Sequence, residues 1–206
     1  MILRFGNTRV PVSSSWASEE HFFLDRCRWF GGIAICQHHD TGPISDRGKP
    51  LFSKPHMQRQ RRAMALGLCD ICGLGLRTAT KVSLSHARPQ PHGAEGWAIL
   101  QVEPMMHRAC AVEALQSCPS LRRDIDQGTL QIRQVLRWRA QCAIMDADYV
   151  ETITGQRVKA LGHGKIELLE WQDRDADWLQ RGVSTHIVAP DLIRGKASPS
   201  TSAGVA

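Results

Sequence analysis

The alternation of apolar and polar residues is clearest in the middle of the chain. The segment HMQRQRRAMALG consists of helix-forming residues without an interior glycine or proline and ends on glycine, which is typical of a helix and its C-terminal stop. The segment KVSLSH alternates as a half-buried strand does, with Val82, Leu84 and His86 on one side. A proline ends each of the next two patterns, WAILQVEP and HRACAVEALQSC. The elements expected here are a helix over 56–67, strands over 81–86 and 97–104, and a helix over 107–118.

The residues that follow favour strands. Residues 131–145 alternate over an unusual length and predict one strand with a cationic face that includes Arg137 and Arg139. Residues 150–171 predict two further strands around turn glycines, and residues 173–182 predict a short closing helix. The apolar face of the long strand is expected to carry Leu136, Trp138, Ala140 and Cys142.

Both ends of the chain lack such patterns. Residues 1–54 contain many breakers, so we expect a mostly irregular extension with one short element around residues 21–30. The last residues are small and polar and cannot bury enough surface to offset ordering, which predicts a disordered tail. Its segment THIVAPDLIRG resembles translated palindromic repeats of proteobacterial genomes. The expected α+β protein is therefore divided into an irregular extension (1–54), a metal-binding module (55–126), a β-rich segment packed on it (127–181) and a disordered tail (182–206).

Composition narrows the class of protein. The chain has 206 residues, 42% of them hydrophobic and 22% charged, which suits one ordinary domain with loose ends. No run reaches the roughly 18 apolar residues of a membrane span, and the N-terminal segment lacks the apolar core of a secretion signal. We therefore expect a cytoplasmic protein with no membrane partner. Seven cysteines without an export signal favour a thiolate metal site over a disulfide framework.

Two pairs of residues have the spacing of metal ligands. Cys69 and Cys72 enclose a turn, and Gly73 allows the backbone to fold closely around an ion. His107 and Cys110 are three residues apart and lie on one face of the start of the expected helix. Zinc requires four soft or borderline ligands in a tetrahedron, which two such pairs supply. The sequence thus predicts a structural Zn²⁺ site.

Other uses of the cysteines are less well supported. A redox CxxC pair begins a helix after a parallel strand, whereas here a helix precedes the motif and a glycine follows it. Cys118 and Cys142 are expected to be small buried apolar residues. A second metal group could be formed by Cys27, Cys36, His38 and His39, whose spacing matches no strong template.

Residues 66–118 resemble the treble-clef zinc folds, in which a two-ligand knuckle is followed by a β-hairpin and a helix that offers two more ligands. Some treble clefs are HNH endonucleases, and the segment SHARP is similar to the first catalytic element of that family. This resemblance implies that His86 is a general base that activates water. The alternative is a partly buried polar residue that caps the strand.

The rest of the HNH pattern is missing. The single asparagine of the chain is Asn7, far from the motif, and Ser85 replaces the acidic residue before the histidine. No histidine follows Cys110 in the helix. The resemblance therefore implies a degenerate endonuclease at most.

A net charge of +6 and a pI near 9.2 favour an anionic partner only moderately. Arginine side chains bind phosphates bidentately, so an arginine-rich surface predicts contact with DNA or RNA. The alternative is an ordinary solvated surface, because acidic residues are interleaved. The candidates are Arg59, Arg61, Arg62, Arg88, Arg108, Arg122, Arg123, Arg133, Arg137 and Arg139.

Residues 50–180 resemble small zinc-binding proteins of phages and prophages, through motifs such as SKPHMQRQRRAM, LCDICG and EGWAILQVEP. That group has no described activity, so the resemblance implies a zinc site and a setting but no reaction. We expect a non-catalytic zinc protein that contacts DNA or RNA. The alternatives are an HNH-like endonuclease with His86 as base and a protein-binding zinc adaptor.

Overall fold

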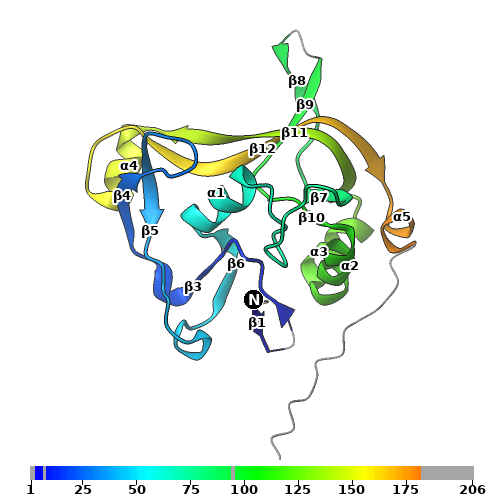
Figure 1. The fold of residues 1–206 in the computed structure, drawn as a ribbon, viewed down its shortest axis with the longest axis horizontal. Coiled ribbons are helices and arrows are strands. Elements are labelled where there is room, and N and C mark those ends of the chain that lie inside the picture. Colours follow the sequence, from blue (N-terminus) through cyan, green and yellow to red (C-terminus); the bar gives the residue numbers. More distant parts are fainter. Residues whose placement is uncertain (1–2, 7, 94–95, 182–206) are drawn as a thin grey trace, which may run out of the picture.

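The computed structural model describes residues 3–6, 8–93 and 96–181, so the predicted tail lies outside the described residues. The protein is α+β, and most strand pairs of its main sheet are antiparallel (Figure 1). The strands of this sheet lie in the order β10 (Met106–His107), β7 (Lys81–Ser85), β11 (Gln131–Met145), β12 (Ala160–Arg174), β5 (Ile33–Gln37) and β4 (Phe22–Arg26).

Strands β11 and β12 form a long curved antiparallel ribbon that arches over the helices (Figure 1). The prediction of one strand over 131–145 is confirmed. The register shifts between Val135 and Arg137, so Leu136 is an extra residue and is 49% exposed. The expectation that Leu136 lies on the apolar face is therefore wrong, whereas Trp138 packs against the core.

The expectation of two strands over 150–171 is wrong. Helix α4 (Ala147–Thr154) ends at Gly155, whose φ of 74° provides the left-handed cap, and one continuous strand follows. Gly162 and Gly164 lie inside this strand. A Cβ atom would lie 2.5 Å from Cγ of Met145 at the first position and 2.7 Å from Sδ of Met64 at the second. These glycines therefore permit close packing rather than turns.

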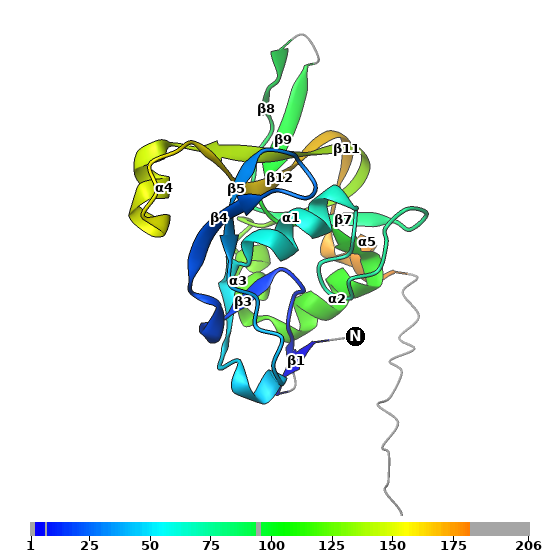
Figure 2. The same ribbon diagram turned by 60° about the vertical axis from the view of Figure 1, so that its left-hand side comes forward.

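The strand predicted over 81–86 is formed as β7, but it does not pair with the strand predicted over 97–104. Strand β7 pairs with β10 and β11, so residues 81–82 and 106–107 make the hairpin contact. Ser83 is fully buried and donates from Oγ to Oε1 of Gln101, at 2.6 Å. The strand is thus buried on both faces, not half-buried. The second predicted strand is β9 (Trp97–Gln101), which pairs with β12 and with β8 (Gln90–Pro91) in a projecting hairpin (Figures 1 and 2).

The N-terminal region is more regular than the sequence predicts. Strands β4 and β5 pair with each other, and β5 joins the main sheet through Ala34 and Leu161. Trp16 is fully buried. The apolar run IAIC of β5 packs against α1 and α4, since Ile35 clusters with Met57 and Val150. The remaining elements are β1 (Arg4–Phe5), β2 (Thr8–Arg9), β3 (Ser14–Trp16), β6 (Pro50–Pro55) and the 3₁₀ turns Ala17–Glu19 and Ile44–Asp46.

The helices lie below the ribbon (Figures 1 and 2). The predicted helices are formed, and a further one starts at Pro119, where proline at the first position begins a helix as well as ending the previous one. The main core lies between the ribbon, the knuckle and α2. None of the described helices is long and apolar enough to cross a membrane. The helices are α1 (Met57–Ala65), α2 (Arg108–Ser117), α3 (Pro119–Asp126), α4 and α5 (Ala176–Gln180).

Candidate metal centre

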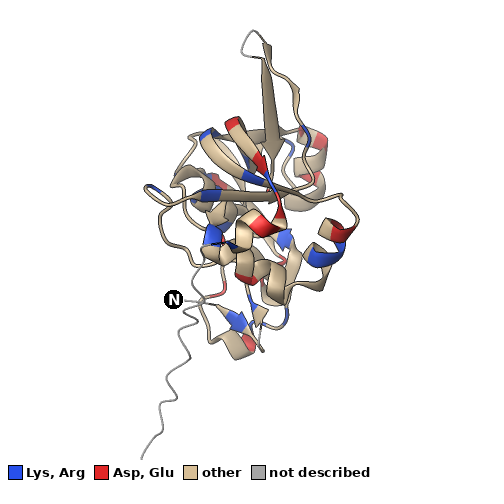
Figure 3. Cartoon of the chain, turned by 90° about the vertical axis from the view of Figure 1, so that its right-hand side faces the viewer, with Lys and Arg blue, Asp and Glu red and all other residues tan. Residues whose placement is uncertain are grey.

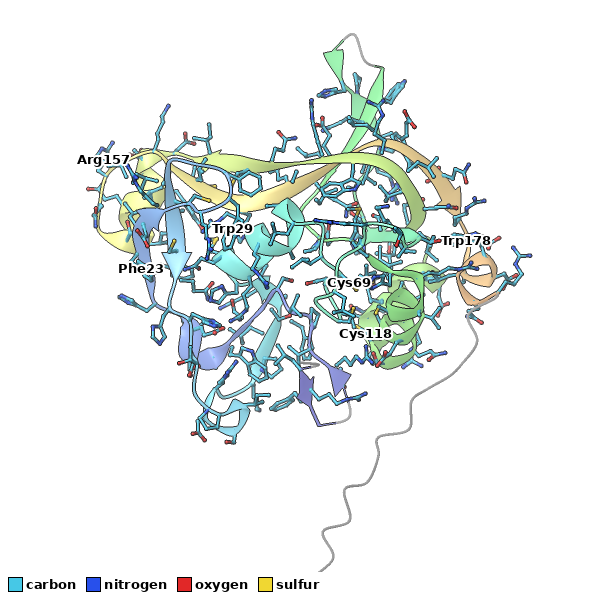
Figure 4. The ribbon with its side chains drawn as sticks, in the orientation of Figure 1. Phe23, Trp29, Cys69, Cys118, Arg157 and Trp178 are labelled. Atoms are coloured by element: carbon cyan, nitrogen blue, oxygen red, sulfur yellow. The ribbon has the colours of Figure 1, made fainter. Side chains whose placement is uncertain are left out.

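The four residues predicted as metal ligands lie together. The ligand atoms of Cys69, Cys72, His107 and Cys110 are all within 4.8 Å of one another. Cys69 is fully buried, and Figure 4 shows it in the interior beside α2. Two segments that are far apart in the sequence therefore converge on a volume that could hold a metal ion.

A tight knuckle positions the first pair. The N–H of Gly73 donates to the carbonyl of Cys69, and the N–H of Cys69 donates to the carbonyl of Leu74, each at 2.8 Å. Gly73 has a φ of 72°, a conformation that disfavours residues with a Cβ atom. This turn places the sulfurs of Cys69 and Cys72 on the same side.

The start of α2 positions the second pair. His107 is both the last residue of β10 and the N-cap of α2, and Cys110 lies in the first turn of that helix. The N–H of His107 donates to the sulfur of Cys69, at 3.4 Å. The free N–H groups of a helix start stabilise negative charge, which favours thiolates here.

The imidazole of His107 has a defined orientation. Its Nδ1 atom lies 3.3 Å from the sulfur of Cys72, and its Nε2 atom lies 3.3 Å from the carbonyl oxygen of Gly75. A proton on Nε2 donates to that carbonyl and leaves the Nδ1 lone pair directed at the sulfurs. Histidines that bind a metal through one ring nitrogen typically donate from the other nitrogen to a carbonyl or carboxylate in this way.

The thiols are electrostatically coupled. The pKa of Cys69 is lowered to about 4, first because Cys110 donates its S–H to the Cys69 sulfur and further because backbone N–H groups donate to it. The same hydrogen bond raises the pKa of Cys110, and burial raises the pKa of Cys72. Binding of a divalent cation would release these protons and let all three sulfurs bind as thiolates.

A second group of side chains also lies within 4.8 Å: Glu19, His39 and His56. Here a cation is already present, because the guanidinium of Arg59 donates to both carboxylate oxygens of Glu19, at 2.6 and 2.7 Å. Both ring nitrogens of His56 are also used, since Nδ1 accepts from the Arg59 N–H and Nε2 lies 3.1 Å from the carbonyl oxygen of His38. We therefore interpret this group as structural. His39 belongs to this group. The second metal group considered from the sequence, Cys27, Cys36, His38 and His39, is not formed among the described residues.

His86 lies just beyond the end of β7, and its side chain is 54% exposed, not partly buried. Its Nε2 atom is 3.4 Å from Oδ2 of Asp124 in α3. Within the described part of the chain, His86 belongs to no cluster of metal-ligating side chains. A histidine and carboxylate pair is thus present without the metal-binding partners that an HNH site requires.

Several predicted surface arginines are buried structural residues. Arg61 is fully buried, where it donates to the carbonyls of Gly162 and Ile35 at 2.7 and 2.8 Å. Arg59 pairs with the buried Glu19. The guanidinium groups of both residues are therefore engaged inside the protein, where helix α1 directs them towards the sheet and the N-terminal strands.

Other predicted arginines are engaged at the surface. Arg108 donates to the carbonyl of Leu179 at 3.1 Å and stacks on Trp178, with 4.3 Å to the ring centroid. Arg137 and Arg139 form ion pairs with Glu170 and Glu167, so the cationic face of the ribbon is neutralised (Figure 3). Arg133, in contrast, is buried, and it pairs with Asp173. Arg123 is exposed, and its Nε lies 3.6 Å from Oδ1 of Asp124. The predicted arginines that are exposed and have no ion pair within the described part of the chain are Arg62, Arg88 and Arg122.

Two cations beside the centre, Arg77 and Lys81, were not predicted. Lys81 is the register partner of His107, and its Nζ lies 3.5 Å from the carbonyl oxygen of Arg77. The residue Arg77 is exposed. Arg62 is exposed in the last turn of α1, which leads into the knuckle. Their position near a CxxC motif was a signal in the sequence. We call Arg62, Arg77 and Lys81 the knuckle rim.

Comparison of the chain with protein-family models, with curated proteins and with solved structures finds no match.

Proposed function

We propose that the protein is a non-catalytic zinc protein whose Cys₃His centre is a structural, treble-clef-like site. The observation that carries this proposal is the convergence of three sulfurs and one imidazole nitrogen within 4.8 Å. Cys₃His is a common set for structural zinc, and catalytic zinc sites instead keep one position for water. The order of knuckle, β7 paired with β10, and α2 supports a treble-clef arrangement.

Zinc would connect the knuckle to α2. A structural zinc ion contributes about 10 kcal/mol or more of apparent folding free energy, which is comparable with the stability of a whole domain. The core around the centre includes Ile71 and Leu76 of the knuckle and Ala111 of α2. Removal of the ion should therefore unfold this part of the protein.

We further propose that the protein contacts DNA or RNA through the knuckle rim, together with Arg88 and Arg122. Residues 47–94 contain nine lysines and arginines and a single acidic residue, Asp70, which is buried. Exposed cations that are not neutralised by neighbouring carboxylates are the groups that bind phosphates. This set replaces the buried and ion-paired arginines of the sequence prediction.

Fluorescence anisotropy with labelled duplex DNA and single-stranded RNA tests this surface. We expect affinity to fall as salt rises, because cations released from phosphates drive such binding. The triple substitution Arg62→Gln, Arg77→Gln and Lys81→Gln should lower the affinity and reduce the salt slope by about 0.9 per lost phosphate contact. The matched control replaces two arginines and one lysine that are exposed outside this segment, Arg26→Gln, Arg28→Gln and Lys159→Gln, and should have a smaller effect. Binding that is independent of salt, or equal in both triple variants, would contradict the proposal.

The pair of His86 and Asp124 is the observation that favours an HNH-like endonuclease as the second candidate. A carboxylate beside a histidine orients the ring so that its other nitrogen can accept a proton from water. Cleavage of plasmid DNA in the presence of magnesium that is lost in His86→Ala would support this candidate.

We further propose that the protein acts in the cytoplasm and derives from a phage or prophage. The presence of phage genes beside its own gene tests the phage or prophage origin.

A further inference from the structure

A cleft of about 470 Å³ lies next to the metal centre, on the side of the knuckle that faces Asp70. This volume is within the range of sites that bind organic ligands, roughly 300–1,000 Å³. Its walls are formed by the N-terminal segment, β6 at Phe52, the knuckle, β7, residues 103–106, and the pair of helices α2 and α3. The apolar lining includes Pro11, Ile71, Leu84, Met106, Ala114 and Leu121.

The cleft is built on rigid elements. Ile71, Leu84, Met106 and Ala114 are all at most 8% exposed and belong to the main core. Such walls keep their shape without a ligand, so little ordering is required when one binds. Phe52, which is 53% exposed, also lines the cleft and adds an exposed aromatic ring to its apolar walls.

Carboxyl groups give this apolar cleft its electrostatic character. The carboxylate of Glu103 accepts from Oγ of Ser85 at 3.2 Å and has no ion pair with a cation in the described chain. Asp70 accepts from the N–H of Ser13 at 3.2 Å and likewise has no cationic partner there. Glu113, in contrast, is neutralised by Arg9 at 2.5 Å. Two acidic groups are thus left without compensation.

We propose that this cleft binds a segment of a partner polypeptide in which an aromatic side chain adjoins a lysine or arginine. The ring would occupy the apolar walls, and the cation would pair with Glu103 at the rim. Phosphates of a nucleic acid would be repelled by the same carboxylates, so this surface is distinct from the knuckle rim. A polypeptide is favoured over a small amine because the lining continues from the buried walls to the exposed ring of Phe52, which leaves apolar surface for a second residue of the ligand.

Three acetylated, amidated tetrapeptides test the proposal by NMR titration against the full-length zinc-loaded protein. Their sequences are Gly-Trp-Lys-Gly, Gly-Trp-Glu-Gly and Gly-Ala-Lys-Gly. We expect saturable binding of the Trp-Lys peptide, and about tenfold weaker binding of the Trp-Glu peptide, the size of one favourable ion pair near a protein surface. The Ala-Lys peptide should not bind, because it lacks the ring.

Two variants locate the site. Glu103→Gln should remove the preference for Trp-Lys over Trp-Glu, and Ser117→Phe should abolish binding by filling the cleft, which Ser117 lines. Circular dichroism and zinc content confirm that both variants are folded. Equal binding of the two tryptophan peptides, binding unaffected by Ser117→Phe, or no saturable binding would overturn the proposal. So would tryptamine binding as tightly as the Trp-Lys peptide, since the ligand would then be a small amine. The anisotropy assay with nucleic acid is independent of each of these outcomes.

Discussion

The Nδ1 atom of His107 lies 3.3 Å from the sulfur of Cys72, although 34 residues separate the two in the chain. The contact joins the knuckle after α1 to the first turn of α2. Because Nε2 of the same ring faces the carbonyl of Gly75, its orientation does not depend on the sulfur alone. The predictions below follow from this arrangement and from the buried charges around it.

Loss of one ligand should uncouple the knuckle from α2. We expect Cys72→Ser to release zinc and to unfold the surrounding core, since the ion supplies on the order of 10 kcal/mol. Cys118→Ser is the matched control, because Cys118 is a half-buried cysteine outside the cluster (Figure 4) and should change stability by less than about 1 kcal/mol. Thermal unfolding followed by circular dichroism measures both. Equal melting temperatures would contradict a structural role for the metal.

The buried His56 should make stability depend on pH. Burial, followed by the nearby charge of Arg59, lowers the pKa of His56 to about 4, so the folded state holds the ring neutral. The unfolded chain binds a proton near pH 6.5. Stability from this group is therefore fully present above pH 6.5 and is lost as the pH falls from 6.5 towards 4.

Urea unfolding of the wild type and of His56→Asn across this range tests that effect. Any effect of zinc release at acid pH is common to both proteins, so it cancels in the difference between their free energies of unfolding. We expect the wild type to lose up to about 3 kcal/mol relative to the variant, from a shift of 1.36 kcal/mol per pKa unit. Parallel curves would show that His56 takes up a proton in the folded state as readily as in the unfolded chain.

Neighbouring arginines in α1 should differ sharply in their contribution to stability. Arg61→Ala leaves the carbonyls of Gly162 and Ile35 without donors and creates a cavity, so we expect a loss of about 2–4 kcal/mol in the free energy of unfolding. Arg62→Ala removes an exposed side chain, with an effect within about 0.5 kcal/mol. Chemical denaturation measures both variants. Similar losses would contradict the burial of Arg61.

Gly164 should tolerate no side chain. A Cβ atom there would lie 2.7 Å from Sδ of Met64 and 3.4 Å from Cα of Arg61, so Gly164→Ala should push α1 away from β12. Overpacking of this kind costs about 1–3 kcal/mol. Gly75, which has open space around its Cα atom and no positive φ, provides the control Gly75→Ala. A stable Gly164→Ala protein with an unchanged melting temperature would contradict the close packing.

Local patterns predicted part of this structure. The helices α1 and α2, the long strand β11 and the four clustered ligands follow from periodicity, prolines and ligand spacing, all of which act over short distances. The partner of β7 did not follow, because strand pairing depends on the competing strands β10 and β11. The glycines of β12 looked like turn residues because their reason, close contact with Met64 and Met145, lies elsewhere in the chain.

The roles of the arginines were the least predictable from sequence. Arg59 and Arg61 are two positions apart, yet one pairs with Glu19 and the other donates to backbone carbonyls. Neither partner is near in sequence, so charge composition alone suggested a phosphate-binding surface. The apolar cleft likewise combines segments that are distant in the sequence, so no local pattern predicted it.

Metal content tests the central claim most directly. Native mass spectrometry of the purified full-length protein, with elemental analysis, should find one zinc ion per chain. Cys110→Ala and His107→Ala should lose it, whereas Cys118→Ser should retain it. A wild-type protein that is folded and binds no metal when zinc is supplied, or a Cys110→Ala protein that keeps its zinc, would contradict the Cys₃His centre.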